Sequence, residues 1–532
     1  VRDAAFDLLR RRGLTTLFAN PGSTEIPFLT GMPDDLEFVL GLHEGSVVGM
    51  ASGYAIGRGE PALVLLHTTA GLGNAVGALA TARVNRAPLV VAVGQQDRRH
   101  LSFEPFLAGR LDGLAGEYPV RVEQPARAQD VPAALERAFH AAATVRGPAL
   151  VIVPMDDWEA PADEAREPAA LLGSVLRATE PDAAAVDALA AFLAEATAPA
   201  VVVGAGADDP ATWAALVEVA ERLVAPVFQE AFGARAGFPQ DHRLFAGVLP
   251  ADRAQLRSVL SPYDAVLVVG APAFRQAGYA PGSLTEPGTR LALVSDDPEE
   301  IYRSPVQVAV LAPPAGVCHE LAGRLPRRDT APPEPARRAP APTPPAPGEQ
   351  LRASHVLAAL AERLPRDAIV LEESPVDRPE LQHRLPAREP LGYLSAAQGG
   401  LGFAIPAAAG LRMALPQRPV VAIVGDGSAL YQIQGLWSAA RYQAGPLYVI
   451  LSNGGYTIMD RLAERHGGAG PWPGLEELEL ATIARSFGCA ARRITTHEEL
   501  VSALDEVVPT LGSRDAPLLL DVAIAPTSSF VP

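Results

Sequence analysis

The chain has 532 residues, of which 48% are hydrophobic and 20% are charged, so it can form roughly two to four globular domains. Its formal net charge of −17 argues against nucleic acid and anionic membrane surfaces as partners. All 44 basic residues are arginine, which excludes a phosphate-binding loop with a Gly-Lys pair and excludes Schiff-base chemistry on lysine.

The remaining composition favours a reduced intracellular protein. No apolar run is long enough to cross a bilayer, and no signal peptide is recognisable in the chain. The two cysteines, Cys318 and Cys489, lack metal-binding spacing. We therefore expect a cytoplasmic protein that has no membrane partner.

The first block of the sequence alternates predicted helices and strands. A helical stretch at residues 3–12 is followed by the short apolar runs "TLFA", "ALVLLH", "LVVAVG" and "ALVIVP". This rhythm is typical of βα units around a parallel sheet. We expect this first domain to span residues 1–170.

A second block contains the apolar runs "AVVVGAG", "APVFQ", "AVLVVG" and "RLALVS", and it predicts a middle α/β domain over residues 182–325. Its stretch "VVVGAGADD", residues 201–209, resembles a dinucleotide-binding turn, but Asp209 stands where a third glycine is needed. We interpret the stretch as a structural turn between a strand and a helix. No motif supports a flavin in this domain, and a yellow colour of the purified protein would reveal one.

A proline-rich segment separates the second and third blocks. Nine prolines fall within the 25 residues 326–350, and a segment so rich in proline cannot pack as helix or sheet. We predict an extended linker over residues 326–348 and a third α/β domain over residues 349–532. The predicted fold is therefore of the α/β class, with three doubly wound domains that each contain a parallel sheet.

Two predicted strands of the third domain each end in a polar side chain among glycines. Asp426 lies in a "GDG" triplet, and Asn453 precedes two glycines. Ligands of parallel α/β sheets bind at the carboxyl ends of the strands. The Asp426 carboxylate, the Asn453 amide and the Gly455 carbonyl supply oxygen ligands that suit a Mg²⁺ ion holding a diphosphate. The alternative is a helix-capping acid and a turn asparagine, which are both common.

The spacing of these motifs resembles that of thiamin-diphosphate-dependent enzymes. The "GDG" triplet is followed by 25 residues and then by Asn453, although Ser452 replaces the first of two asparagines in the family pattern. The resemblance covers essentially the whole chain and implies thiamin diphosphate and Mg²⁺ as cofactors, with Asp426, Asn453 and Gly455 as metal ligands. The cofactor-binding residues that it implies are Glu44, Leu401, Gly425, Asp426, Gly427, Ser428, Asn453, Gly455 and Tyr456.

The resemblance also assigns roles and an assembly. Glu44, in "LHEGSVVGMASGYA", would hydrogen-bond the pyrimidine ring of the cofactor and so activate its thiazolium carbon. Leu401, in "SAAQGGLGFAIPAAAG", would lie beneath the cofactor and force it to bend. In this family the first domain of one subunit faces the third domain of another. The implied assembly is a homo-oligomer, at least a dimer and often a tetramer, with active sites between subunits.

Four stretches in combination resemble the benzoylformate decarboxylases within this superfamily: "ANPGSTEIPFL", "LLHTTAGLGNAVGAL", "GAPAFR" and "GGLGFAIPAA". The resemblance implies that Ser23 binds the substrate carboxylate and that His67 moves protons during the reaction. The expected catalytic residues are therefore Glu44, His67 and Ser23. Taken alone, Ser23 is equally typical of a helix cap and His67 of a strand end.

Five positions depart from the benzoylformate decarboxylases in the expected substrate pocket. Ala277 replaces a second catalytic histidine. Ser395 and Leu462 replace phenylalanines, and Pro375 and Arg378 replace threonines. The loss of aromatic surface favours a non-aromatic or polar substrate. Arg378 would favour a second anionic group on the substrate if it points inward, and it would otherwise be a solvated loop arginine.

The sequence therefore predicts a lyase that decarboxylates a small-molecule 2-oxo acid without oxidation. A first alternative is a carboligase or lyase that forms or cleaves 2-hydroxy ketones. An alternative of another class is a non-catalytic subunit that binds the cofactor. The presence of Glu44, Asp426 and Asn453 argues against this last alternative.

Overall fold

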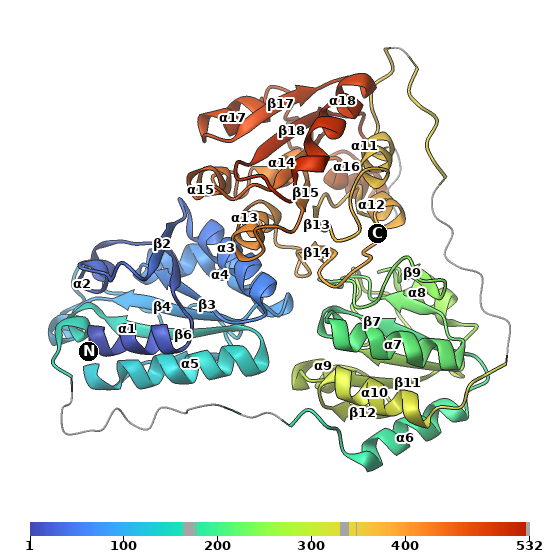
Figure 1. Ribbon diagram of the computed structural model, residues 1–532, viewed down its shortest axis with the longest axis horizontal. Helices are drawn as coiled ribbons and strands as arrows, with labels where there is room; N and C mark the ends of the chain where they lie inside the picture. Colours follow the sequence, from blue (N-terminus) through green and yellow to red (C-terminus); the bar gives the residue numbers. More distant parts are fainter. Residues whose placement is uncertain (163–174, 176–177, 330–339, 347, 528–532) are drawn as a thin grey trace.

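The computed structural model describes residues 1–162, 175, 178–329, 340–346 and 348–527. These residues form three six-stranded sheets, and every strand pair within them is parallel. Figure 1 shows three α/β units, the first in blue, the middle one in green and the third in orange and red. The expected fold of three doubly wound parallel-sheet domains is therefore confirmed.

The first sheet has the strand order β2-β1-β3-β4-β6-β5. Its strands are β1 (Thr16–Asn20), β2 (Glu37–Leu40), β3 (Ala62–Leu66), β4 (Leu89–Gln95), β5 (Arg121–Glu123) and β6 (Pro148–Pro154). Its helices are α1 (Arg2–Arg11), α2 (Ile26–Leu29), α3 (Glu44–Arg58), α4 (Thr68–Val84) and α5 (Val131–Val145). Helices α3 and α4 share a buried cluster with one face of the sheet, and α1 and α5 share another with the opposite face.

The middle sheet has the strand order β12-β11-β10-β7-β8-β9. Its strands are β7 (Pro199–Val203), β8 (Val227–Gln229), β9 (Phe245–Val248), β10 (Ala265–Val269), β11 (Arg290–Ser295) and β12 (Val308–Leu311). Its helices are α6 (Ala183–Ala194), α7 (Pro210–Leu223), α8 (Arg253–Leu260), α9 (Pro298–Tyr302) and α10 (Pro314–Arg324). The turn after β7 leads into α7, where the Asp209 carboxylate accepts hydrogen bonds from the backbone N–H groups of Ala211 and Thr212. Asp209 therefore caps a helix, as the interpretation of a structural turn requires.

The third sheet has the strand order β14-β13-β15-β16-β18-β17. Its strands are β13 (Ile369–Glu373), β14 (Tyr393–Ser395), β15 (Val420–Gly425), β16 (Leu447–Ser452), β17 (Ala490–Ile494) and β18 (Leu518–Ala523). Its helices are α11 (Ala353–Ala361), α12 (Arg378–Arg384), α13 (Ala404–Ala414), α14 (Asp426–Ala429), α15 (Gly435–Arg441), α16 (Thr457–Arg465), α17 (Leu480–Ser486) and α18 (His497–Val507). The central strands β15 and β16 end at the two motifs that the sequence singled out.

The first and third domains share one hydrophobic core, because α3 packs closely on α13. Glycines make this approach possible. A Cβ atom at Gly53 of α3 would lie 2.1 Å from the carbonyl oxygen of Ala407, and one at Gly410 of α13 would lie 1.9 Å from that of Met50. Larger side chains would push the helices apart, so the relative position of these two domains depends on this pair of small residues.

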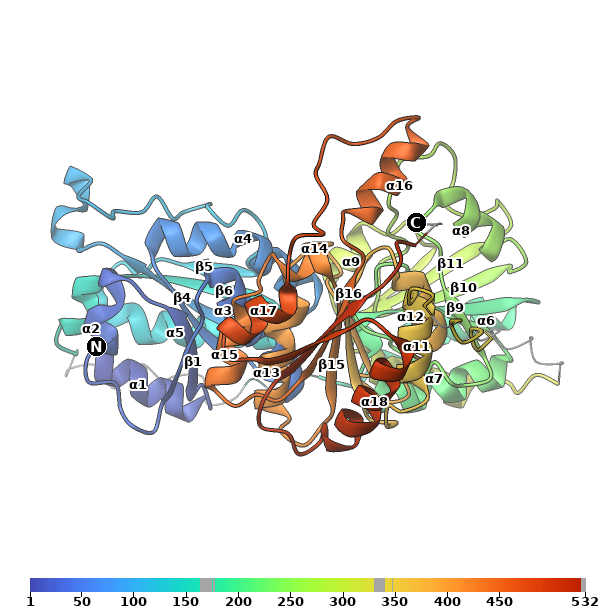
Figure 2. The same cartoon turned by 90° about the horizontal axis from the view of Figure 1, so that it is seen from above.

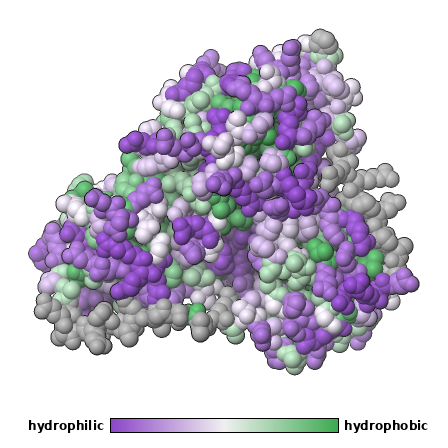
Figure 3. All heavy atoms as spheres, viewed as in Figure 1, coloured by the Kyte–Doolittle hydropathy of each residue, from purple (hydrophilic) through white to green (hydrophobic). Residues whose placement is uncertain are grey.

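The predicted linker lies partly outside the described residues. Its described parts, residues 326–329, 340–346 and 348, contain no helix or strand. Both cysteines are buried and unpaired. Within the described part of the chain, no helix is long and apolar enough to cross a membrane, and Figure 3 shows hydrophilic side chains over most of the visible face.

Candidate functional site

Three expected catalytic residues lie at one edge of the first sheet. Ser23, Glu44 and His67 follow the carboxyl ends of β1, β2 and β3, which are neighbours in the sheet. Carboxyl ends of parallel strands meet at the same edge, so the fold brings these side chains to one place.

Glu44 is the first residue of α3 and is only 7% exposed. Its Oε1 accepts a hydrogen bond from Asn20 Nδ2 at 3.1 Å, and its Oε2 accepts one from Asn74 Nδ2 at 3.0 Å. The two amides fix the carboxyl group in one orientation. Sequence reasoning missed Asn20 and Asn74 as positioning residues, although both lie within the stretches that carry the family resemblance.

His67 is held by a buried acid that sequence reasoning also missed. Its Nδ1 lies 2.9 Å from Glu25 Oε2 and 3.0 Å from Thr24 Oγ1. The Gly22 N–H donates a hydrogen bond to Glu25 Oε2 at 2.7 Å, and a Cβ atom at Gly22 would lie within 2.5 Å of the imidazole ring. A glycine is therefore needed there for the ring to lie in place. Ser23 is exposed beside this pair, and its hydroxyl has no hydrogen-bond partner among the described residues.

The carboxyl edge of the third sheet holds the predicted diphosphate and metal residues. Asp426 Oδ1 accepts a hydrogen bond from Gly427 N at 2.8 Å, and Oδ2 accepts one from Gly454 N at 2.7 Å. Gly454 has a φ of +77°, which favours glycine, so the sequence supplies the residue that this turn requires. Burial raises the pKa of Asp426, and the backbone N–H groups oppose that shift. The result is a buried acid at the joined ends of β15 and β16.

These residues fit a magnesium diphosphate. Asn453 Oδ1 accepts only the Gly455 N–H, at 3.1 Å. A Cβ atom at Gly455 would meet nothing within 4 Å, so the loop leaves open space at this position. The donor set of one carboxylate, one amide and one backbone carbonyl suits Mg²⁺ rather than a transition metal. The described residues contain no group of three or more His, Cys, Asp or Glu side chains that could hold a metal ion.

The loop that carries Leu401 is anchored by Glu373 at the end of β13. One oxygen of this buried carboxyl group accepts the Gly402 N–H, and the other accepts the Ala404 N–H at 2.5 Å. Burial raises the pKa of Glu373 to about 8, against the effect of these two N–H groups. Leu401 itself is half-buried, between Gly399 and Gly402, which both have positive φ angles. Glu373 thus holds the backbone that follows Leu401, and so fixes the position of Leu401 relative to the Asp426 motif.

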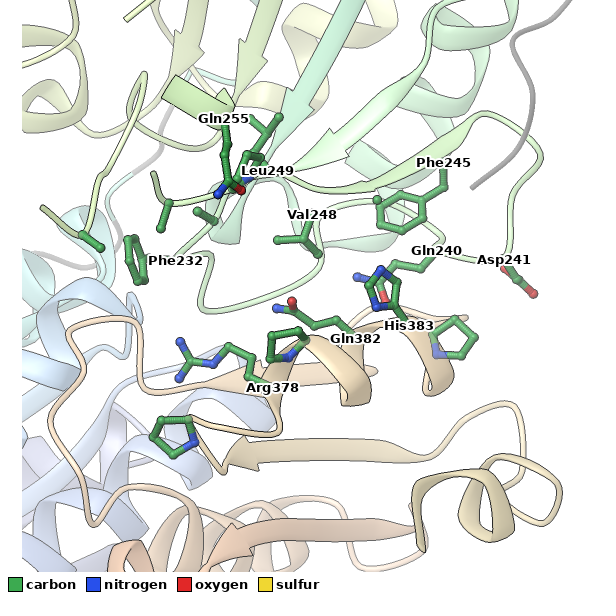
Figure 4. Close-up of a pocket in the computed structure, with 18 of the residues that line it drawn as sticks. Phe232, Gln240, Asp241, Phe245, Val248, Leu249, Gln255, Arg378, Gln382 and His383 are labelled. Carbon is green, nitrogen blue, oxygen red and sulfur yellow. The ribbon is translucent and has the colours of Figure 1, made fainter. Parts of the chain in front are cut away.

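A cavity of about 780 Å³ lies between the middle and third domains. Of the residues predicted for the substrate pocket, Ala277, Pro375, Arg378 and Leu462 line this cavity, whereas Ser23 and His67 do not. Figure 4 shows side chains of the middle domain facing those of α12 across this space, and in Figure 2 α16 projects from the third domain at the top of the view. Ile458 and Leu462 of α16 belong to the lining, and α16 begins just after the Asn453 loop. The cavity therefore reaches the helix that follows the Asn453 loop.

Ser395 differs from those four lining residues, because the structure does not bring it to the cavity. Its side chain is buried, and its hydroxyl donates a hydrogen bond to the Gly233 carbonyl at 3.3 Å. Its own carbonyl accepts a hydrogen bond from Asn85 Nδ2 at 2.9 Å. Ser395 of the third domain therefore bonds residues of the first and middle domains, and it does not line the cavity.

Arg378 is not a solvated loop arginine. It is the first residue of α12, its side chain is 23% exposed, and its Nε donates a hydrogen bond to Glu372 Oε2 at 2.6 Å. The attraction of Glu372 raises the pKa of Arg378 above its ordinary value. The side chain extends into the cavity toward Phe232 (Figure 4).

The two sets of predicted cofactor residues are not bonded to each other within one chain, although Ser46, near Glu44 in α3, donates a hydrogen bond to Gln432 Oε1 of the third domain at 2.7 Å. Among the described residues, no hydrogen bond or ion pair joins Ser23, Glu44 or His67 to Asp426 or Asn453. Phe103 and Phe106, in the loop after β4 at the same edge as Ser23, are 82% and 86% exposed. Exposed aromatic side chains of this kind are typical of a surface that another chain covers.

Comparison with known proteins assigns all three domains. Residues 1–115 match the N-terminal TPP binding domain of thiamine pyrophosphate enzymes. Residues 186–321 match their central domain, and residues 380–522 match their C-terminal TPP binding domain.

Several relatives match the chain over its full length. It is 39% identical to a benzoylformate decarboxylase of Pseudomonas aeruginosa, across 100% of this chain and 99% of that protein. The structure of a thiamine diphosphate-dependent 4-hydroxybenzoylformate decarboxylase from Rhodococcus jostii RHA1 superposes with a TM-score of 0.94 at 37% identity, covering 99% of both chains. That of benzoylformate decarboxylase from Polynucleobacter necessarius gives 0.92 at 31% identity, covering 100% of this chain and 99% of that chain.

Proposed function

Because this chain belongs to the family of thiamine pyrophosphate enzymes, we propose that it decarboxylates a 2-oxo acid without oxidation, with thiamin diphosphate as its cofactor. The observation that carries the proposal is the full-length similarity to decarboxylases. Glu44 lies fixed between two amides, and Asp426 lies fixed between two backbone N–H groups.

Asp426, Asn453 and the Gly455 carbonyl would hold a Mg²⁺ ion, and the ion would hold the diphosphate. The backbone of Gly425 and Gly427, with Ser428 and Tyr456, would contact the cofactor around it. The support is the donor set described above and the open space at Gly455. When bound, thiamin diphosphate supplies a nucleophilic carbon and an electron sink for the electrons released with carbon dioxide.

The chain's own residues would orient the cofactor and handle protons. Glu44 would share a proton with a nitrogen of the pyrimidine ring, because its carboxyl group is held in place by Asn20 and Asn74. Leu401, whose loop is held in place by Glu373, would pack against the cofactor and keep it in its bent shape. Both functions require a rigid scaffold, which the strand ends provide.

Ser23 and His67 would act on the substrate. The free hydroxyl of Ser23 would donate a hydrogen bond to the substrate carboxylate. His67 would transfer protons at the reacting carbon and oxygen, and Glu25 would fix the imidazole tautomer through Nδ1. Glu25 is 1% exposed, so it acts as a positioning residue and does not contact the substrate.

We propose a homo-oligomer in which the edge that carries Glu44 faces the Asp426 loop of a second subunit. The support is the exposed Phe103 and Phe106, together with the absence of a hydrogen bond or ion pair between the two sets among the described residues. A dimer would complete two sites, since a two-fold axis that places the Glu44 edge of one subunit against the Asp426 loop of the other also forms the reciprocal pair.

A second activity, carboligation, is favoured by one observation. Ala277 lines the cavity at the position where the benzoylformate decarboxylases have a second catalytic histidine. Its methyl group cannot supply a proton to the carbon that has lost carbon dioxide. If that proton arrives slowly, the same carbon can attack an added aldehyde and give a 2-hydroxy ketone.

A screen of 2-oxo acids tests the proposed function. The protein, loaded with thiamin diphosphate and Mg²⁺, should release carbon dioxide and the corresponding aldehyde from at least one of them. Release should cease when the cofactor is omitted. Tight cofactor binding without any turnover would instead support a non-catalytic subunit.

A further inference from the structure

The cavity between the middle and third domains is mostly apolar but contains several polar and charged side chains. Its volume is about 780 Å³, and its lining combines apolar side chains with glutamines, histidines and arginines. Phe232, Val248, Leu249 and Leu462 can contact a carbon chain. The polar residues of the lining must therefore determine which chemical group is bound at the far end of that carbon chain.

Most charged groups of the lining already have partners at its rim. Asp241 is bonded to Arg366 at 2.8 Å, and in Figure 4 its carboxylate points away from the cavity. Arg243 lies 3.2 Å from Glu221, and its side chain is half exposed. Burial lowers the pKa of His242, which disfavours its charged form. These groups do not present a charge to the interior.

Arg378 does present one, because only part of its guanidinium is used. Its Nε–H bonds Glu372, and the part of the chain that the structure describes offers no other hydrogen-bond partner to it. The two terminal nitrogens therefore form an open edge that extends into the cavity toward Phe232 (Figure 4). Two parallel N–H donors on such an edge match the two oxygens of a carboxylate.

Glu372 fixes the direction of this edge. Its side chain is completely buried, its Oε1 accepts the Ser374 N–H at 2.8 Å, and its Oε2 also lies 3.4 Å from the Tyr393 hydroxyl. A carboxylate held at three points cannot turn to follow the arginine. The arginine is therefore pre-oriented, and little side-chain entropy remains to be lost when a ligand binds.

We propose that Arg378, positioned by Glu372, binds a second carboxylate at the far end of the substrate, so that the enzyme prefers 2-oxo dicarboxylic acids. The inference rests on the proposed function and names its substrate class. The apolar side chains of the lining would contact the methylene groups between the two ends of the substrate.

Matched substrate pairs test this proposal in the loaded wild-type enzyme. Each pair has the same chain length, with either a carboxylate or a methyl group at the far end: 2-oxoglutarate against 2-oxopentanoate, and 2-oxoadipate against 2-oxohexanoate. The carboxylate member of at least one pair should have a kcat/KM about 10- to 100-fold higher, as expected for a charged hydrogen bond. Equal values, or a preference for the methyl member in both pairs, would overturn the proposal and leave the decarboxylase function intact.

Variants locate the effect. Arg378→Gln should reduce the preference ratio by about 10- to 100-fold, mainly through KM. Glu372→Gln should reduce it partially, and Arg378→Lys should recover part of it, because a lysine keeps the charge but not the two-pronged edge. Arg384→Gln, on the same helix but outside the cavity lining, is the control that should leave the ratio unchanged. An unchanged ratio in Arg378→Gln would overturn the proposal.

A binding measurement separates failure of this proposal from failure of the function. Calorimetry with 2-oxoglutarate and 2-oxoadipate on the cofactor-loaded protein should show binding that Arg378→Gln weakens. Binding without turnover would contradict the decarboxylase function alone. Turnover of monocarboxylic 2-oxo acids without dicarboxylate binding would contradict the Arg378 proposal alone.

Discussion

The cofactor loops and the neighbouring cavity are built in different ways. In the loops around Asp426, backbone N–H groups and short glycine turns at the ends of two neighbouring strands hold the polar atoms. In the cavity, side chains from several segments of two domains form the lining. A backbone-built site tolerates few substitutions, whereas a side-chain lining can change one residue at a time. We therefore expect the first region to set the type of reaction and the second to set the substrate.

Asp426→Ala should have the largest effect. Without this carboxylate the diphosphate charge is poorly neutralised, and thiamin diphosphate binding in the presence of Mg²⁺ should weaken by more than about 100-fold. Isothermal titration calorimetry is the measurement. Asp505→Ala, at an exposed acid of the same domain, is the control. Wild-type affinity in Asp426→Ala would remove the metal assignment.

Glu44→Gln separates cofactor binding from cofactor activation. The amide cannot exchange the proton with the pyrimidine ring, so hydrogen–deuterium exchange at the thiazolium carbon should slow by about 10²- to 10⁴-fold. Much of the cofactor affinity should remain, because Asp426 is intact. Quenched-flow proton NMR measures the exchange, with Glu60→Gln, at an exposed glutamate, as the control. An unchanged rate would show that Glu44 is not the activating acid.

Glu25→Gln should impair turnover without affecting cofactor activation. The amide disturbs the hydrogen bond that orients His67, and kcat/KM should fall by about 10- to 100-fold for every 2-oxo acid alike. Exchange at the thiazolium carbon should keep its wild-type rate. A loss confined to one substrate class would instead place Glu25 in substrate selection.

Ala277→His should change the products more than the rate. With an aldehyde acceptor present, the wild type should direct a substantial fraction of its turnover to the 2-hydroxy ketone. The introduced imidazole should shift the ratio toward free aldehyde by a few-fold, provided that it faces the cofactor. The ratio is measured at matched conversion and acceptor concentration. If the wild type releases only aldehyde and the ratio does not move, another group already supplies the proton.

Leu462→Phe should have the smallest effect. It restores an aromatic surface at one point of the cavity lining, so the relative kcat/KM for aryl over aliphatic 2-oxo acids should rise by about 10-fold or less. A uniform loss for both classes would indicate that the phenylalanine merely obstructs the cavity.

The sequence predicted the cofactor region well, because glycines and single polar residues at strand ends are visible as short motifs. It predicted cofactor roles for Asp426, Asn453 and Glu44, which the structure places beside the carboxyl ends of strands, and it predicted the three parallel-sheet domains. It did not identify Asn20, Glu25 or Asn74, because nothing in a single sequence shows which neighbouring strand ends will exchange hydrogen bonds. These contacts exist only once β1, β2 and β3 lie side by side.

The cavity was predicted less completely for the same reason. Four of the expected positions line it: Ala277, Pro375, Arg378 and Leu462. Ser395 does not, because its side chain is hydrogen-bonded to the Gly233 carbonyl. The sequence alone also left the direction of Arg378 open. Its direction depends on Glu372, six residues earlier, and on how β13 and α12 place the two side chains. Contacts of this kind are set by packing, not by local sequence.

Subunit complementation tests the central claim most directly, namely that the Glu44 edge and the Asp426 loop are two halves of one thiamin diphosphate site. Glu44→Gln and Asp426→Ala should each be inactive alone. After the two variants are mixed, unfolded and refolded together, a mixed dimer should contain one site with both residues intact. Carbon dioxide release should then recover to about one quarter of the wild-type rate, as random pairing predicts. No recovery, in a mixture shown to contain mixed dimers, would contradict the claim.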